Sequence, residues 1–398
     1  MSASLSSANA SSQPHVAIDG KAFRLLFVDS HFALWRIHSD RKTSSANMDY
    51  IAYWSAGQLL RHHSDPYSPV GVFALEKAMG FLPGIPLIMR NPPWALFLVA
   101  PLGLVSGRLG LFLWILLAAA CILVSIHLLN PRSKDNSLAL LFAPAIACFG
   151  SGQSSPFLLL GFALFLRFDR SRPFLAGASL LLMAIKPHLF LIFWAVLLID
   201  SIQRRKFAVL AGAASAVASA TIFAMCFDAH IWSRYSAMLR SSALDREVFP
   251  TVSMLLRVLI DAHVNWLLFI SSTVAVLWGI WFYVSNSNEW DWTTHGMLLM
   301  LVTVLASPYG WFTDEIVLLP SIMFAFNFPA KRRYSGWILL SINGAAAIVY
   351  TAAGARLESP VLIWTPLAWF AWFLYATWGP PQFDRPQHSA IALEDANA

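Results

Sequence analysis

The chain contains few charged residues and few cysteines. Asp, Glu, Lys and Arg make up 12% of its 398 residues, and only 21 residues are acidic. Because charged residues are about 25% of a typical soluble domain, this composition argues against a soluble protein. The three cysteines, Cys121, Cys148 and Cys226, lie inside apolar runs without the spacing of metal ligands. They are predicted to be structural, and the sequence predicts no metal and no cofactor.

Motifs of soluble enzymes are absent as well. The chain has no P-loop, no dinucleotide-binding glycine fingerprint, and neither an HExxH nor a GxSxG motif. No polar segment is long enough for a cytosolic catalytic domain, which argues against an enzyme of that kind using a nucleotide sugar. The net charge of +6 does not indicate a nucleic-acid partner, because the basic residues form short clusters between apolar runs, where they set membrane topology.

Apolar residues are abundant, at 58% of the total, and form runs along most of the chain. Several runs extend for about 20 residues or more without a charge, which is the length of a helix that crosses a bilayer. The predicted fold class is therefore all-α, a polytopic integral membrane protein with about 11 membrane-spanning helices (range about 10–13). The predicted apolar helices are 109–129, 136–150, 155–166, 173–185, 187–199, 207–227, 264–284, 293–307, 315–329, 335–352 and 360–378.

Clusters of basic residues predict the orientation in the bilayer, because such clusters remain on the cytoplasmic side. The clusters are Arg132/Lys134, Arg167/Arg170/Arg172, Arg204/Arg205/Lys206 and Lys331/Arg332/Arg333. All four clusters lie on the cytoplasmic side if residues 173–199 cross the membrane twice, as two short helices that meet at Lys186-Pro187-His188. Four junctions then lie together on the outer face, and they are residues 150–153, 186–188, 228–252 and 307–315.

This orientation divides the chain into five predicted parts. They are a disordered tail (1–21), a weak first helix (22–42), an outer loop with interfacial helices (43–108), a transmembrane helical domain (109–378) and a cytoplasmic tail (379–398). The first helix is weak because Arg24, Asp29 and Arg36 are each costly at membrane depth. The apolar stretch 92–105 is short for a crossing, so it is predicted to lie in or dip into the interface, with a true span as the alternative.

An acidic and aromatic segment, Met48–Trp54, stands just ahead of the hydrophobic body. At helical spacing Asp49 and Tyr53 share one face, and Asp49 directly precedes the predicted helix 50–61. A carboxylate at the outer face is suited to act as general base for a hydroxyl nucleophile, so Asp49 is the candidate catalytic residue and Tyr53 a candidate substrate-binding residue. A helix N-cap is the alternative role for Asp49, and the two roles are compatible.

Polar residues also interrupt the apolar runs at the predicted outer junctions. Lys186 is the only charge between Arg172 and Asp200, and an isolated intramembrane lysine indicates a functional site with an anionic partner such as a lipid phosphate. The alternative is a lysine that snorkels to the interface. Gln153 is a candidate hydrogen-bond donor to a sugar or phosphate, or else part of a turn that ends a helix.

The junction 307–315 combines aromatic residues with acids. Tyr309 and Trp311 are suited to stack on a sugar while the carboxylates of Asp314 and Glu315 hold its hydroxyls. An interfacial aromatic belt with ordinary loop acids is the alternative. Arg90 adds a cation on the predicted outer side.

Short motifs follow one another in order over about residues 47–330. They are Asp49–Gly57 with Asp65-Pro66-Tyr67, Asn91–Trp94 with Pro101-Leu102, Gly152-Gln153, Ala176-Gly177, Lys186-Pro187-His188, and Ser307–Asp314 with Leu318-Leu319-Pro320. In order and spacing they resemble the bacterial membrane glycosyltransferases of family 87, in the GT-C superfamily. The chain departs from that pattern at 22–42, where the family is expected to have a clear first helix.

The resemblance implies a multi-helix GT-C fold with its active site at the outer face of the inner (cytoplasmic) membrane. The donor would be a hexose, often mannose, on a polyprenyl phosphate, and a lipid or glycan hydroxyl would accept it with inversion of the anomeric centre. Asp49 matches the family's expected base, and Lys186 and His188 are expected near the donor phosphate. No metal is required, because phosphate is already a good leaving group.

Two other functions remain open from the sequence. A transporter or flippase for a lipid-linked sugar would use the same polar breaks as a substrate path, although the internal repeats typical of transporters are not evident. A polysaccharide polymerase or ligase would be expected to carry its large outer loop late in the chain, where residues 228–252 are short.

Overall fold

The computed structural model describes seven stretches of the chain, all of them within one unit. They are residues 48–80, 86–131, 136–241, 249–261, 263–328, 333–354 and 360–377. Within these stretches the chain is helical, with no β-strand. The predicted first helix (22–42) and cytoplasmic tail (379–398) lie outside the described residues, as do Arg132 and Lys134.

Four described helical segments are long and apolar enough to cross a membrane. They are α6 (Gly107–Leu129), α11 (Phe207–Phe227), Asn265–Ser285, which joins η7 (Asn265–Phe269) to α14 (Ile270–Ser285), and α17 (Ser335–Ala352). Each corresponds to a predicted apolar run. The all-helical class is therefore confirmed for the described residues, whereas the count of about 11 crossings stays a prediction.

The other apolar runs form shorter helices, several of which begin with proline. They are η4 (Asn136–Leu141), α7 (Ala143–Ser151), α8 (Ser155–Phe168), α9 (Pro173–Met183), η5 (Pro187–Phe190), α10 (Leu191–Gln203), α15 (His295–Leu305), η8 (Phe312–Leu318), α16 (Leu319–Phe326), η9 (Pro360–Leu362) and α18 (Trp364–Thr377). Pro144, Pro156, Pro173 and Pro187 each lie in a first turn, where a missing backbone N–H breaks no helical hydrogen bond. Proline thus separates these helices from the segments before them.

The long helices expose large apolar side chains. Phe112 and Leu116 on α6 are more than half exposed, as are Leu277 and Trp281 on α14. Rows of such side chains are unfavourable in water but match the hydrocarbon region of a bilayer. The surface therefore supports placement of these helices in lipid.

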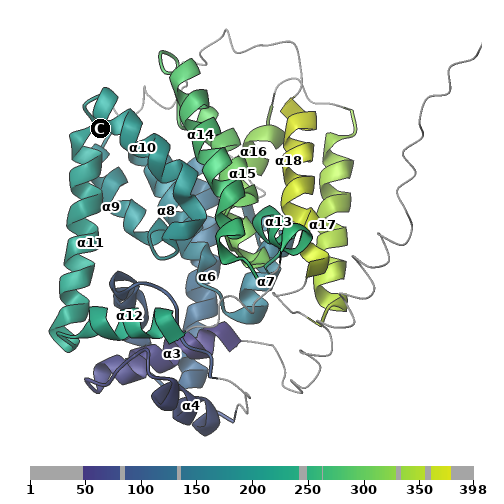
Figure 1. Ribbon diagram of the computed structural model, residues 1–398. Coiled ribbons are helices and arrows are strands. Elements are labelled where there is room, and N and C mark those ends of the chain that lie inside the picture. Colours follow the sequence, from purple (N-terminus) through teal and green to yellow (C-terminus); the bar gives the residue numbers. More distant parts are fainter. Residues whose placement is uncertain are drawn as a thin grey trace, which may run out of the picture. The chain divides into compact units, whose positions relative to one another are not determined.

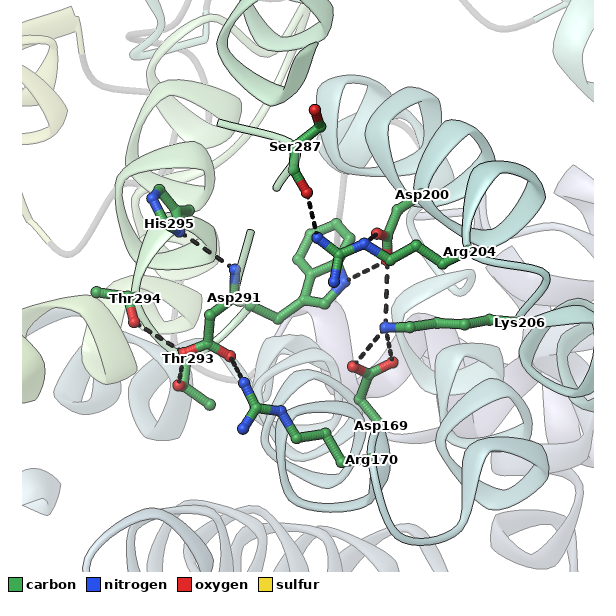
Figure 2. A network of polar contacts seen from close by, with 11 residues as sticks. Asp169, Arg170, Asp200, Arg204, Lys206, Ser287, Asp291, Thr293, Thr294 and His295 are labelled. Carbon is green, nitrogen blue, oxygen red and sulfur yellow. Dashed lines mark hydrogen bonds and ion pairs between the residues drawn. The ribbon is translucent and has the colours of Figure 1, made fainter. Parts of the chain in front are cut away.

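At one end of the bundle, the buried carboxylate of Asp200 near the end of α10 connects neighbouring helices (Figure 2). Its Oδ1 accepts from Tyr283 (3.2 Å) and pairs with Arg204 (2.9 Å). Its Oδ2 accepts from the Trp292 indole (3.0 Å) and lies 3.3 Å from Lys206 Nζ. These partners satisfy both oxygens, as a buried charge requires.

Two further ion pairs connect the neighbouring turns (Figure 2). Lys206 Nζ also lies 2.8 Å from Asp169, and Arg170 lies 2.8 Å from Asp291. The turns α8–α9, α10–α11 and α14–α15 therefore meet at one end of the bundle, named here the basic end. Two of the predicted basic clusters, around Arg170 and Arg204, lie there together.

Helix α11 connects the basic end to the opposite end. It starts just after Lys206 and runs for 21 residues, which is about 31 Å. At its far end the carbonyl of Phe227 accepts a 3.0 Å hydrogen bond from His63. The Tyr50 hydroxyl donates to the carbonyl of Gly107, the first residue of α6, at 2.8 Å. Helices α3, α4 and α12 lie at this second end (Figure 1), named here the α3 end.

Short helices make up the α3 end. They are α3 (Met48–Arg61), α4 (Pro69–Ala78), η2 (Pro93–Ala95), α5 (Leu96–Val99), η3 (Ala100–Leu104) and α12 (Ile231–Ser241). The stretch 92–105 is divided among three of them, so it forms no single spanning helix. Helix α13 (Val252–Ile260) packs instead against η7 and α14. Gly57 and Gly103 let α3 and η3 touch backbone to backbone, because a Cβ on Gly103 would lie 2.3 Å from the carbonyl oxygen of Gly57.

Helices α9 and α11 pack backbone to backbone at Gly177 and Gly212. A Cβ on Gly177 would lie 1.9 Å from the carbonyl oxygen of Val209. We therefore expect Gly177→Ala to force the helices apart and to lower the free energy of unfolding by about 1–3 kcal/mol. Thermal unfolding of the purified protein in detergent measures this. Gly344→Ala on α17 is the matched control, because open space surrounds that position, and an equal loss there would contradict the packing argument.

Candidate active site

A buried ion pair joins two of the predicted junctions. Lys186 Nζ lies 2.6 Å from Asp314 Oδ1, and the two residues are 6% and 1% exposed. Lys186 stands between α9 and η5, whereas Asp314 lies in η8. An uncompensated charge at either position would be strongly unfavourable, so each side chain requires the other.

Hydrogen bonds extend this pair to the start of α8. Lys186 Nζ also donates to Gln153 Oε1 (3.0 Å) and to Ser155 Oγ (3.3 Å). Ser155 in turn donates to Asp314 Oδ1 at 2.6 Å. An ammonium group has three donors, and these three contacts use all of them. The second carboxylate oxygen of Asp314 accepts from the backbone N–H of Trp311 at 2.9 Å.

Helix α3 reaches the same cluster through Tyr53. Its hydroxyl contacts Gln153 Oε1 at 3.2 Å and Ser154 Oγ at 3.1 Å. Burial raises the pKa of Tyr53 to about 12, with the charges of Lys186 and Asp49 acting in opposite directions. The hydroxyl therefore stays protonated and can donate to Gln153.

Backbone contacts hold Lys186 in place. The Asn91 amide donates to the carbonyl of Ile185 at 3.0 Å, and the Trp94 indole donates to that of Ala184 at 2.8 Å. Both carbonyls belong to the two residues directly before Lys186. The motif Asn91–Trp94 thus positions the turn that presents the lysine.

Gly152 brings α3 close to the segment that carries Gln153. It ends α7 with a φ of +72°, a conformation that favours glycine. A Cβ at this position would lie 2.4 Å from the Cβ of Tyr50. The Trp114 indole donates to its carbonyl at 2.9 Å. The motif Gly152-Gln153 therefore combines a close contact to α3 with a hydrogen-bonding side chain.

Asp49 lies in the first turn of α3, which begins at Met48. Asp49 is therefore inside the helix and is not its N-cap residue, the alternative role suggested by the sequence. It is half-buried, and its charge acts on Tyr53 and on Lys186. Burial alone would lower the pKa of Lys186, but the carboxylates, chiefly Asp314, more than offset this and raise it. Lys186 is therefore a charged ammonium with two carboxylates in its surroundings.

An aromatic group borders the ion pair. The rings of His188 and Tyr309 stack with centroids 3.9 Å apart, and Phe249 contacts Tyr309 and Trp311 at 5.8 and 4.9 Å. The exposed Arg90 acts electrostatically on Tyr309. The group therefore combines half-buried rings with a cation at the surface.

All nine predicted site residues belong to these two neighbouring groups. Asp49, Tyr53, Gln153, Lys186 and Asp314 surround the ion pair, and Arg90, His188, Tyr309 and Trp311 form the aromatic side. Lys186 and Asp314 were predicted to hold different parts of a substrate, yet they contact each other. The predicted roles themselves stay predictions.

Sequence reasoning did not single out Ser154 and Ser155, although they directly follow Gln153. Their position in a polar break next to a candidate residue was the available signal. Glu315 was predicted together with Asp314 as an acid that holds sugar hydroxyls, but its link to α18 was not predicted: its buried carboxylate accepts from Thr365 (2.6 Å) and Trp369 (2.8 Å). No local pattern links positions that are 50 or more residues apart.

The arrangement can perform acid–base and electrostatic chemistry on a polar substrate. It offers a carboxylate, two cations, several hydroxyls and aromatic rings at one end of an apolar bundle. Within the described part of the chain, no group of three His, Cys, Asp or Glu side chains is arranged to hold a metal ion.

Comparison with known families confirms the predicted resemblance. The model described as glycosyltransferase family 87 matches residues 90–308, more than half of the chain. The match includes Gln153 and Lys186, while Asp49 precedes it and Asp314 follows it. No similar protein of known function and no similar solved structure was found. On the family match, the chain belongs to glycosyltransferase family 87 and is a multi-pass membrane glycosyltransferase.

Proposed function

We propose that the protein transfers a hexose, with mannose as the first candidate, from a polyprenyl phosphate to an acceptor hydroxyl with inversion of the anomeric centre. Its fold would be of the GT-C type, and the α3 end would face the outer side of the inner membrane. The observation that carries the proposal is the buried Lys186–Asp314 pair with Asp49 beside it. Buried, charge-balanced groups at the end of a membrane bundle are typical of functional sites.

In the proposed reaction, Asp49 is the general base. Its carboxylate takes the proton of the acceptor hydroxyl while the acceptor oxygen forms a bond to the anomeric carbon. The bond from that carbon to the phosphate oxygen breaks, and the phosphate leaves with the electron pair. Displacement from the opposite side inverts the anomeric centre. The half-buried position of Asp49, at the start of α3, leaves one side of it accessible.

Two cations are candidates for stabilising the leaving phosphate. Arg90 is exposed next to the Tyr309 ring, and a guanidinium fits phosphate geometry well. Lys186 already uses its three donors, so a direct contact with phosphate requires it to release one partner. The contact to Ser155, at 3.3 Å, is the longest of the three. His188, Tyr309 and Trp311 would then hold the sugar, with Gln153 and Tyr53 beside the pair.

A transfer assay with the purified full-length protein tests this proposal. A panel of polyprenyl-phosphate hexoses is offered with alkyl glycosides as acceptors, and the anomeric configuration of the product is determined by NMR. We expect one donor to be used with inversion. Failure with every donor, combined with movement of a lipid-linked sugar across vesicles, would contradict transfer and favour the flippase alternative. Products longer than one added sugar unit would instead favour the polymerase.

A further inference from the structure

A second polar group lies beside Asp49, at the outer end of α17 in the proposed orientation. The Tyr350 hydroxyl is buried, with the residue 3% exposed, and has no hydrogen-bond partner among the described residues. The Thr313 hydroxyl of η8 is also buried, with the residue 0% exposed, and it too has no hydrogen-bond partner among the described residues. Buried hydroxyls without a partner are rare, and each requires an explanation.

Contacts place both residues around the end of α7. The ring of Tyr350 lies 5.7 Å from that of Phe312, the residue before Thr313. The Thr313 carbonyl accepts a 3.5 Å hydrogen bond from the thiol of Cys148. The charge of Asp49 acts on both Tyr350 and Cys148. Tyr350 and Thr313 therefore both lie around the end of α7, which also contacts the start of α3.

Gly150 lies next to the Tyr350 hydroxyl. It lies in α7 and is exposed, and a Cβ there would stand 3.3 Å from the Tyr350 oxygen. Two residues later, Gly152 lies against the backbone of Tyr50, which directly follows Asp49. The end of α7 therefore contacts both the Tyr350 hydroxyl and the start of α3.

We propose that Tyr350 and Thr313 bind the acceptor, an alcohol of the sugar-hydroxyl class, and hold its oxygen next to Asp49, with Gly150 keeping the approach open. This rests on the proposed function. The Tyr350 hydroxyl donates a hydrogen bond to the acceptor oxygen while Asp49 accepts its proton, so the two residues orient the nucleophile from different helices. An ordered water at the same position would also satisfy the hydroxyl, but it would leave acceptor binding independent of Tyr350.

Two variants test the proposal, and neither is expected to destabilise the protein. Tyr350→Phe removes a hydroxyl that has no partner in the described structure, and Gly150→Ala replaces a helical glycine by a better helix former. With the preferred polyprenyl-phosphate hexose as donor and octyl α-mannoside as acceptor, Tyr350→Phe should raise the KM for the acceptor about tenfold, the effect of one lost hydrogen bond. Gly150→Ala should also raise the acceptor KM, because its methyl group would stand 3.3 Å from the Tyr350 oxygen. The KM for the donor should stay the same. The unfolding midpoint should stay the same or rise.

Matched controls are Tyr334→Phe and Gly344→Ala, since Tyr334 is exposed and Gly344 faces open space. Hexose released to water is measured in parallel. An acceptor KM that stays unchanged in both variants, or a KM that rises equally for donor and acceptor, would overturn the acceptor site alone. Hexose release by the wild type without transfer to octyl mannoside would overturn the sugar-hydroxyl class. Absence of both release and transfer with every donor would instead contradict the proposed function, and the acceptor site with it.

Discussion

Asp49→Asn is expected to reduce hexose transfer by about 100- to 10,000-fold, the usual contribution of a positioned general base. Asparagine keeps the size and shape of the side chain but does not take up the acceptor proton. Because Asp49 is only half-buried in the first turn of α3, the fold should tolerate the change. Initial rates at saturating donor and acceptor, together with the unfolding midpoint, measure the two effects separately.

The control for this experiment is Asp261→Asn, which neutralises an exposed acid just after α13. It should leave the rate unchanged. In Asp49→Gly, added formate should restore part of the rate, because a small carboxylate can occupy the vacated position and accept the proton. An Asp49→Asn rate near that of the wild type, or a loss that formate leaves unaffected in Asp49→Gly, would rule out the base assignment.

Lys186→Met is expected to have the second large effect, on both stability and transfer. It leaves the carboxylate of Asp314 buried without its cation, and breaking such a pair costs about 3–5 kcal/mol. Loss of the positive charge near the leaving phosphate should also lower the transfer rate by about 100- to 1000-fold. Chemical unfolding and initial rates per folded molecule measure the two quantities.

The double variant Lys186→Met/Asp314→Asn separates structure from chemistry. With both charges removed, no unpaired ion is buried, so most of the stability should return. The transfer rate should stay low, because the cation is still missing. Recovery of the rate together with stability would mean that the pair only holds η5 and η8 together.

Asp200→Asn provides the matched control for a buried, ion-paired carboxylate. It lies at the basic end, where Arg204 and Lys206 accompany it. Its replacement should lower stability but leave the rate per folded molecule unchanged, because η5 and most of α10 separate Asp200 from Lys186, at about 21 Å of helix. An equal loss of rate in this variant would show that destabilisation alone explains the effect of Lys186→Met.

Local patterns were enough to find the helices. The apolar runs 207–227 and 335–352 coincide with α11 and α17, because uninterrupted apolar sequence, ended by charge, identifies such a helix without any partner. Proline marked where the shorter helices begin, as at Pro187. The boundary of α3 was less accurate, since the helix starts ahead of Asp49 rather than after it.

Glycines in the motifs allow close contact between helix backbones, and only the tertiary structure shows this. Gly177 permits α9 to touch the backbone of α11, and Gly57 permits α3 to touch η3. In sequence these residues are indistinguishable from Gly344, where an added Cβ would have no described atom within 4 Å. Whether a glycine is needed depends on which helix packs against it. The residues close to the glycine in sequence do not show which helix that is.

By itself, the sequence determined an all-helical membrane protein, the positions of its helices, its family and a set of polar residues at the junctions between apolar runs. Only the tertiary structure decided that Lys186 and Asp314, 128 positions apart, neutralise each other, and that the buried hydroxyls of Tyr350 and Thr313 have no partner in the described part of the chain. The physical reason is that hydropathy and turn signals act over a few residues, whereas a buried charge is satisfied by whichever distant helix packs against it.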